Sequence, residues 1–316
     1  MSETEVLSFS HISIAYGGEV ASRDISFTLS RGECLAIVGE SGSGKTTLCK
    51  AILGLLSPDG RITAGDIDFK GQSLLKMSAK ERRSLLGKEI TTIFQDTKDA
   101  FCPIRTVGSQ IHEAMEAHGR TSASSLREKA FSLMRKLGLE EASRIWDSYP
   151  SELSGGMMQR VGIVSALLPE PELILADEPT SALDVLARQE VVRELLLVKK
   201  EIKGSLLCIT HQIEVARQLA DQGMILRQGQ IVEQGRAEDL WQHPKEDYTK
   251  KLLFAGRSCR RTFLSLGEMI SLPQARAVCQ HFPYYAFDWR RHGYSTGRAG
   301  PHPKISKERP DHRSRA

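Results

Sequence analysis

The most informative stretch of this chain reads Gly39-Glu40-Ser41-Gly42-Ser43-Gly44-Lys45-Thr46-Thr47, a glycine-rich loop that contains a single lysine. It follows the apolar run Cys34–Val38, which indicates a buried strand, and it leads into a helical stretch over Thr46–Leu56. Glycines allow backbone N–H groups to close around an anion, and a helix N-terminus adds favourable partial charge. The order of strand, loop and helix therefore predicts an α/β fold with a phosphate-binding loop.

Two side chains of this loop have expected roles in binding a nucleoside triphosphate. Lys45 is expected to reach the β- and γ-phosphates, and the hydroxyl of Thr46 is expected to bind Mg²⁺. The alternative is a glycine-rich turn with a chance lysine. The flanking strand and helix disfavour it, because they supply the context that this loop requires.

Composition places the chain among ordinary globular proteins. Its 316 residues are 40% hydrophobic and 26% charged, enough for one large domain with an appendage or for two domains. No apolar run approaches the roughly 18 residues of a membrane span, and Met1–Glu5 is unlike a secretory signal. Six cysteines without a C-x-x-C pair argue against a zinc ribbon or a disulfide framework. We expect a cytosolic protein.

The last sixty residues differ in charge from the rest. Residues 257–316 hold 12 Lys or Arg and 4 Asp or Glu, whereas the preceding part is net acidic although the whole chain is +4. Aromatic and arginine side chains there suggest a nucleic-acid or anionic-lipid patch. A nickel-binding arm is a second interpretation, but its four histidines are too far apart in the sequence for a metal-ligand cluster: His281, His292, His302 and His312. We favour a third interpretation, a basic and disordered C-terminal extension over 256–316.

Alternation of apolar and polar residues predicts half-buried strands over 6–16, Ile25–Leu29 and Gly65–Phe69. Tyr16 closes the first of these strands. Its ring has the π face needed to stack on a purine, although an ordinary strand tyrosine fits the pattern nearly as well. A further strand, Ile90–Phe94, places Gln95 at its end, where open α/β sheets bind ligands.

The period becomes helical from residue 97 to 160, which predicts a helical insertion. This block ends in Leu153-Ser154-Gly155-Gly156-Met157-Met158-Gln159-Arg160. Ser154 is a natural N-cap, and the two glycines expose backbone N–H groups at a helix start. The chain therefore contains a second device for binding an anion.

Two more apolar strands end in ionisable side chains. The run Leu173–Ala176 is followed by Asp177 and Glu178, and the run Leu206–Thr210 by His211. Asp177 is expected to hold Mg²⁺ through water, and Glu178 to polarise a water for in-line attack. His211 lies where the site needs a polar group near the γ-phosphate. The alternatives are a surface acidic pair and a structural histidine.

Six motifs, in this order along residues 6–254, resemble the ATP-binding subunit of ABC transporters. The resemblance implies a P-loop NTPase core with an antiparallel β subdomain and a helical subdomain, together an ABC ATP-binding domain over 1–255. It assigns ATP contacts to the following residues: Tyr16, Gly39, Glu40, Ser41, Gly42, Ser43, Gly44, Lys45, Thr46, Thr47, Ser154, Gly155, Gly156, Gln159 and Asp184. Mg²⁺ ligands are Thr46, Gln95 and Asp177, and catalytic residues are Glu178, His211 and Gln95.

The same resemblance implies an assembly. The segment Leu153–Arg160 resembles the signature motif that caps the γ-phosphate bound by the opposite subunit, and Asp184 ends the dimer-contact loop. Gln95 matches the glutamine that touches Mg²⁺ and senses the membrane subunits in that family. Two ATPase subunits are therefore expected to sandwich two ATP, so that hydrolysis requires both.

Three stretches are similar to the oligopeptide, dipeptide and nickel importer group: Val38–Lys45, Tyr149–Met157, and His243-Pro244 with Tyr248–Leu253. Membership implies a second, different ATPase subunit, two transmembrane permease subunits and an extracytoplasmic solute-binding protein. It also implies a peripheral position at the cytoplasmic face of the inner membrane, without nucleic acid. Cys102 departs from the pattern of the group, which usually has asparagine before the proline that corresponds to Pro103.

Two differences within that group bear on which cargo we expect. Peptide-importing members commonly continue into a cysteine-rich extension, which is absent here, and nickel-type members end soon after the region of Leu252-Leu253. We therefore favour nickel or a nickel chelate over peptides. Two alternatives remain open: an ATPase of a soluble complex such as phosphonate breakdown, which shares the catalytic residues with an importer ATPase, and a nucleic-acid-associated ABC protein. The second is disfavoured because the chain has one cassette.

Overall fold

A computed structural model describes residues 5–93, 97, 99–119, 123–180, 185–201 and 204–254. All of these lie in the first of the two units into which the chain divides, Met1–Thr262. Gln95, Asp184 and the predicted extension 256–316 lie outside the described residues.

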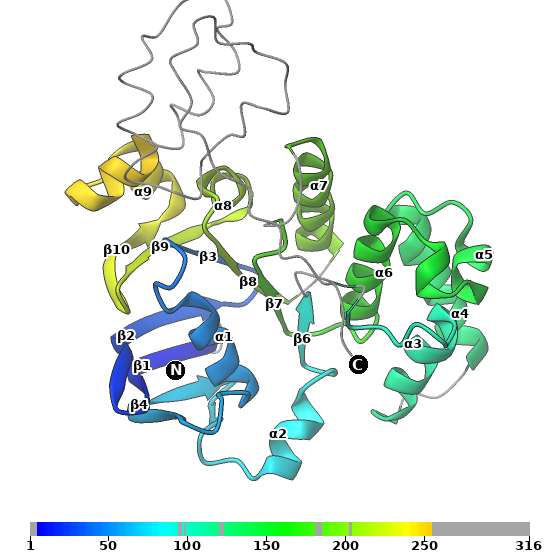
Figure 1. Ribbon diagram of the computed structural model, residues 1–316, viewed down its shortest axis with the longest axis horizontal. Coiled ribbons are helices and arrows are strands. Elements are labelled where there is room, and N and C mark those ends of the chain that lie inside the picture. The colour runs from blue at the N-terminus through cyan, green and yellow to red at the C-terminus, as the bar shows by residue number, and fades with distance from the viewer. Residues whose placement is uncertain are drawn as a thin grey trace, which may run out of the picture. The chain divides into compact units, whose positions relative to one another are not determined.

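A six-stranded sheet in the order β10-β9-β3-β8-β7-β6 forms the centre (Figure 1). Its strands are β3 Cys34–Val38, β6 Ile90–Ile93, β7 Leu173–Asp177, β8 Ser205–Thr210, β9 Gln222–Arg227 and β10 Gln230–Arg236. All neighbouring pairs are parallel except β9 and β10, which form an antiparallel hairpin. Every residue of β3 and β8 is buried, as expected for a parallel sheet covered on both faces.

The register of the parallel strands brings their carboxyl ends together. Val38 pairs with Thr210, and Asp177 pairs with Ile209, so the three segments that follow β3, β7 and β8 leave the sheet at one edge. These segments contain the glycine-rich loop, Glu178 and His211. The edge is the place where open α/β sheets bind ligands.

A second sheet is antiparallel, in the order β2-β1-β4-β5. Its strands are β1 Glu5–Tyr16, β2 Glu19–Ser30, β4 Gly60–Phe69 and β5 Gln72–Ser73, which confirms the strands expected from alternation. Helix α1 (Lys45–Leu53) lies between this sheet and the central one (Figure 1). One hydrophobic core joins all three layers, and it includes the stacked rings of Phe9 and Phe27, 4.5 Å between centroids.

Helix α1 is shorter than expected. The sequence predicts a helix to Leu56, but α1 ends at Leu53, because Gly54 adopts a left-handed conformation with φ 69°. The N–H of Gly54 then bonds to the carbonyl of Ala51, which closes the helix end.

The predicted helical insertion is present as α3 Val107–Glu116, α4 Ala123–Lys136, α5 Ala142–Asp147, a 3₁₀ turn Pro150–Glu152 and α6 Gly155–Leu167. The expected boundary at residue 160 is wrong, since α6 continues to Leu167. These helices share a core with α7 (Val185–Glu201) and with one face of the central sheet. Apolar residues at helical spacing in this block face the core. Four are buried and two are partly buried: Ile111, Met115, Ala130 and Leu137, then Leu126 and Leu133.

Helices α2, α8 and α9 and the helical residues 247–254 complete the described part. Helix α2 (Ala79–Leu85) buries none of its residues and begins with a capping box formed by Ser78 and Glu81. Helices α8 (Ile213–Leu219) and α9 (Ala237–Gln242) pack with residues 247–254, which are also helical, on the β9 side of the central sheet. The sequence analysis did not predict α8.

Candidate functional site

The glycine-rich loop is pressed against neighbouring backbone and has no room for side chains at two positions. A Cβ at Gly39 would lie 2.2 Å from the carbonyl oxygen of Leu226 on β9. A Cβ at Gly44, where φ is 98°, would lie 2.9 Å from both the carbonyl oxygen of Ala21 and Oγ of Ser22. The outer residues Glu40, Ser41 and Gly42 remain exposed. The loop therefore presents backbone, not side chains, to a ligand, as phosphate binding requires.

Lys45 begins α1 and is enclosed by the loop that precedes it. The side chain is 5% exposed, and Nζ donates to the carbonyl oxygens of Gly39 at 2.9 Å and Glu40 at 2.8 Å. Nζ also lies 3.8 Å from Oε1 of Glu178. Burial lowers the pKa of Lys45, and the carboxylates of Glu178 and Asp177 partly oppose this. A cation thus sits at the centre of the loop, where phosphate oxygens would meet it.

Thr46 and Asp177 form an oxygen-rich pair beside this lysine. The hydroxyl of Thr46 donates to Oδ1 of Asp177 at 3.2 Å across the gap between α1 and β7. Burial raises the pKa of Asp177, and the hydrogen bond from Thr46 partly offsets that rise. Hydroxyl and carboxylate oxygens are hard ligands that suit Mg²⁺.

The protein alone would not complete a magnesium site. Within the described ranges, no group of three or more His, Cys, Asp or Glu side chains could hold a metal ion. Mg²⁺ commonly takes one or two protein oxygens and completes its shell with substrate phosphates and water. The residues present therefore fit Mg²⁺ that arrives with a nucleotide.

Glu178 and His211 contact each other directly. Nδ1 of His211 lies 2.7 Å from Oε2 of Glu178, and the two side chains come from the segments after β8 and β7. Glu178 has φ 50°, a conformation that costs a non-glycine residue on the order of 1 kcal/mol. Its N–H donates to the carbonyl of Ile209 at 2.9 Å, which holds this backbone in place. The Glu178 carboxylate is consequently fixed between His211 and Lys45.

A buried polar pair that the sequence analysis missed supports the same two segments. Thr180 donates to Oε1 of Gln212 at 2.9 Å, and Nε2 of Gln212 donates to the Thr180 carbonyl at 3.2 Å. Both side chains are buried, and the backbone N–H of Gln212 bonds to Thr210. In the sequence, Thr180 and Gln212 could have been found only by their positions, because Thr180 follows Glu178 by two residues and Gln212 follows His211 by one.

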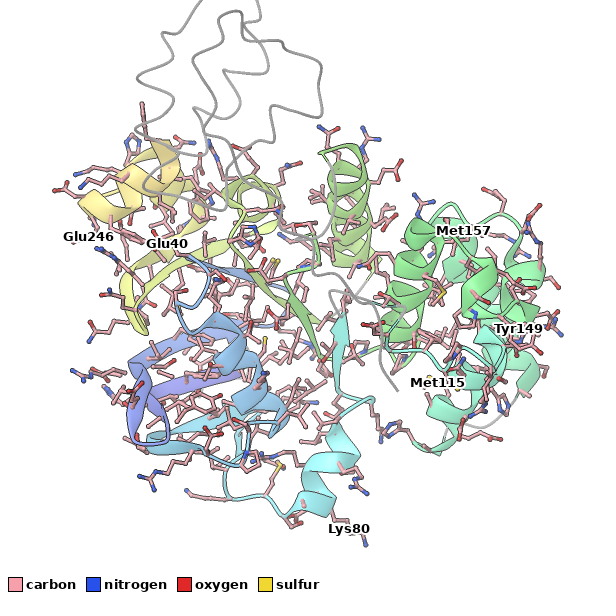
Figure 2. The ribbon with its side chains drawn as sticks, in the orientation of Figure 1. Glu40, Lys80, Met115, Tyr149, Met157 and Glu246 are labelled. Atoms are coloured by element: carbon pink, nitrogen blue, oxygen red, sulfur yellow. The ribbon has the colours of Figure 1, made fainter. Side chains whose placement is uncertain are left out.

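The second predicted anion device is exposed at the start of α6. Ser154 caps the helix, its Oγ accepting the N–H of Met157 at 3.2 Å (Met157 is labelled in Figure 2). Ser154, Gly155 and Gly156 are exposed, and nothing lies within 4 Å of a Cβ placed on either glycine. These three residues are thus accessible. The rest of α6 packs on α4, α7 and β6, whereas α1, which follows the glycine-rich loop, packs on β7 and β8.

Gln159, predicted to belong to the same device, points elsewhere. Its side chain is 8% exposed, and Oε1 accepts the hydroxyl of Thr97 at 3.1 Å inside the helical part. Tyr16 is partly buried at the end of β1, and its ring lies so close to Gly60 that a Cβ there would approach within 2.4 Å. Both side chains therefore have packing partners in their own chain.

Comparison with known proteins identifies the family. Residues 22–181 match the model of the ABC transporter family. The chain is 40% identical to the Metal-staphylopine import system ATP-binding protein CntD of Staphylococcus aureus over 230 residues. This alignment covers 73% of this chain and 84% of CntD. Over 254 residues it is 39% identical to the Dipeptide transport ATP-binding protein DppD of Escherichia coli, covering 79% and 78%.

Solved structures agree with this assignment. The dimeric ATP-binding cassette MJ0796 in a post-hydrolysis state, bound to ADP and Pi, superposes with a TM-score of 0.63 at 26% identity, over 73% of this chain and 98% of that chain. The cbiO1 protein of Clostridium perfringens, part of the complex cbiONQ, shares the fold with a TM-score of 0.66 at 23% identity, over 88% and 100%. The chain belongs to the ABC transporter family. It carries the ATP-hydrolysing domain of that family, which binds ATP or ADP with Mg²⁺.

Proposed function

We propose that this chain is the ATP-hydrolysing subunit of an importer, in which Glu178 accepts the proton of the attacking water. The observation that carries the catalytic part is the fixed carboxylate of Glu178, 2.7 Å from His211 and 3.8 Å from Lys45. Lys45 would bind the β- and γ-phosphates, and Thr46 with Asp177 would hold Mg²⁺, which when bound neutralises charge on the phosphate oxygens. His211 would orient Glu178 toward the γ-phosphate.

We further propose that the cargo is nickel or a nickel chelate. Support comes from the similarity to CntD, whose name states import of a metal with staphylopine, over 84% of its length. Dipeptides or oligopeptides are the second candidate, because DppD of Escherichia coli and the Oligopeptide transport ATP-binding protein AmiE of Streptococcus pneumoniae are 39% and 40% identical.

The proposed assembly follows from the exposed start of α6. Ser154, Gly155 and Gly156 form an exposed helix N-terminus with open space at both glycines, and the similar cassette MJ0796 is dimeric. A second ATPase subunit would bring its nucleotide to this face, and two permease subunits and a solute-binding protein would complete the importer. We place this subunit peripherally at the cytoplasmic face of the membrane. Across the described ranges, every helix is too short or too polar to be a membrane span.

Uptake assays test the cargo. Cells lacking this gene would be complemented with the wild-type chain, with Glu178→Gln, or with Glu140→Gln, which changes an exposed glutamate away from the site. Uptake of radiolabelled nickel, with and without a chelator, is measured beside uptake of a labelled dipeptide.

Three outcomes are distinguishable in this experiment. Nickel uptake lost in the deletion and in Glu178→Gln, but restored by the wild type and Glu140→Gln, supports the nickel proposal. Loss of dipeptide uptake alone would assign the chain to the peptide importers. Unchanged uptake of both would contradict an importer of either kind and favour an ATPase of a soluble complex.

A further inference from the structure

The hairpin of β9 and β10 turns through two residues, Gln228 and Gly229. Both have positive φ, 48° and 73°, which is the conformation of a tight two-residue turn and which glycine adopts without strain. The end of this hairpin lies beside β2 (Figure 1). The turn therefore reaches from the central sheet to the antiparallel sheet.

Gly229 forms a backbone hydrogen bond on each side of this turn. Its N–H donates to the carbonyl oxygen of Ser43, near the end of the glycine-rich loop, at 3.0 Å. Its own carbonyl oxygen accepts the N–H of Arg23 on β2 at 2.8 Å. Gly229 thus connects the glycine-rich loop with the antiparallel sheet.

The junction has no room for a side chain on Gly229. A Cβ there would lie 2.3 Å from the carbonyl oxygen of Ala21 on β2 and 3.0 Å from Cα of Ser22. The same carbonyl oxygen would lie 2.9 Å from a Cβ on Gly44. The backbone of β2 therefore fits closely against both glycines, and a side chain on Gly229 would displace the turn and its bond to Ser43.

The bond to Ser43 sets the direction of the next N–H group. A trans peptide is planar, and its C=O and N–H point in opposite directions. Because the Ser43 carbonyl points to the turn, the N–H of Gly44 points away from the turn, at the start of α1. Within the described ranges this N–H has no acceptor in the protein. It is available to an anion at the helix N-terminus, immediately before the buried ammonium group of Lys45.

We propose that Gly229 is a positioning residue for nucleotide binding. Through Ser43 it directs the N–H of Gly44 toward the phosphate oxygens of the nucleotide, and the close contact with β2 keeps the turn in place. This role rests on the proposed binding of phosphate by the glycine-rich loop and Lys45. Gly229 acts on affinity through the loop and not by contact with the nucleotide.

The test measures binding of a fluorescent ATP analogue with Mg²⁺ to the purified full-length chain. Gly229→Ala should weaken binding about 10- to 100-fold, the contribution of one hydrogen bond to a charged group. Gly71→Ala is the matched control. The two-residue turn between β4 and β5 also has positive φ, 53° at Lys70 and 83° at Gly71, but nothing lies within 4 Å of a Cβ on Gly71. This variant adds the same backbone strain without displacing a neighbour, so its affinity should equal that of the wild type.

A second pair of variants removes the aligned N–H without a clash. A glycine inserted between Gln228 and Gly229 lengthens the turn and adds no side chain, and it should also weaken binding. A glycine inserted between Lys70 and Gly71 should leave affinity unchanged. Melting temperatures verify that the variants are folded at the assay temperature, and if Gly229→Ala is not, the inserted variant decides. Unfolding of both would assign the turn a structural role and overturn the proposal.

Competition by inorganic tripolyphosphate separates positioning of the loop from a general effect. Its affinity should fall by the same factor as that of the ATP analogue, because the lost contact is to phosphate. The proposal is overturned by a loss confined to the ATP analogue, by an equal loss in the Gly71 variants, or by wild-type affinity in both Gly229 variants.

Lys45→Ala, measured in the same assay, distinguishes this proposal from the proposed function. If Lys45→Ala loses binding while both Gly229 variants keep it, only the role of Gly229 is contradicted. If Lys45→Ala binds as the wild type does, the phosphate-binding role of the loop is contradicted, and the role of Gly229 with it.

Discussion

Oε2 of Glu178 lies 2.7 Å from Nδ1 of His211, although 33 residues separate them in the chain. The contact arises from the pairing of β7 with β8, in which Asp177 is opposite Ile209. Glu178 and His211, which follow these two strands, therefore lie at the same edge of the sheet. Glu178 bonds through its backbone N–H to Ile209 as well. The carboxylate proposed as the base is therefore positioned by the neighbouring strand and by the histidine that follows it.

The first prediction concerns the base itself. Glu178→Gln removes the proton acceptor while leaving Lys45, Thr46 and Asp177 unchanged. We expect a fall in ATP turnover of about 10²- to 10⁴-fold, the usual contribution of a general base, with nucleotide affinity kept. Steady-state phosphate release with the partner subunits present, beside binding of a fluorescent nucleotide, measures both. Turnover within a few-fold of the wild type would remove Glu178 from this role.

His211 is expected to act through Glu178. His211→Ala leaves the carboxylate without its 2.7 Å partner, so its orientation is no longer held. Turnover should fall at least tenfold with little change in nucleotide affinity, because a misplaced base affects the chemical step more than binding. His112→Ala, on α3 in the helical part, is the matched control. Equal turnover in the two variants would contradict the positioning role.

How far the sequence predicts this site can be judged residue by residue. The position of the glycine-rich loop, Asp177, Glu178 and His211 at one edge of the sheet was predictable, because apolar runs identify parallel strands and the carboxyl ends of such strands share an edge. The bond between Glu178 and His211 was not, since it depends on strand register and on φ 50° at Glu178.

The sequence did not predict helix α8 or the direction of the Gln159 side chain, because both depend on packing. Helix α8 has seven residues, too few to show a helical period, and it is stabilised by packing of Ala216 and Leu219 against the sheet. Gln159 was grouped with Ser154 by its place in a motif, yet on a helix its side chain points to another face and is buried against Thr97. Periodicity predicts which helices and strands exist, whereas the direction of a single side chain can be predicted only when its neighbours in the fold are known.

Asp177 illustrates a conflict between stability and function. Burial raises its pKa above the usual value of an aspartate, so the charged form destabilises the folded state at every pH above that raised pKa. Asp177→Asn removes the charge and keeps an oxygen that accepts from Thr46. We expect the melting temperature at neutral pH to rise by about 2 °C, while Mg²⁺-dependent nucleotide binding weakens.

The difference in melting temperature between Asp177→Asn and the wild type should depend on pH in a defined direction. As the pH falls through the raised pKa, Asp177 in the wild type takes up a proton and loses its charge, so the advantage of the asparagine should shrink toward zero. Melting curves of both proteins from pH 7.5 down to about 4, without nucleotide, follow this difference. An advantage that grows on acidification would show that burial of this charge is not the cause.

The last prediction concerns the link between α6 and α7. Nε of Arg160, the residue after Gln159, donates to Oε1 of Glu194, whose side chain is 7% exposed, and burial raises the pKa of Glu194. Arg160→Leu leaves this carboxylate without its charged partner, and we expect the free energy of unfolding to fall by about 3 kcal/mol. Replacing both residues by leucine removes the unpaired charge and should recover most of that loss, measured by urea unfolding. Arg105→Leu is the control, because its ion pair with Glu113 is exposed and should contribute less than about 1 kcal/mol. A double variant as unstable as Arg160→Leu would mean that the arginine stabilises the helices by packing, not by compensating Glu194.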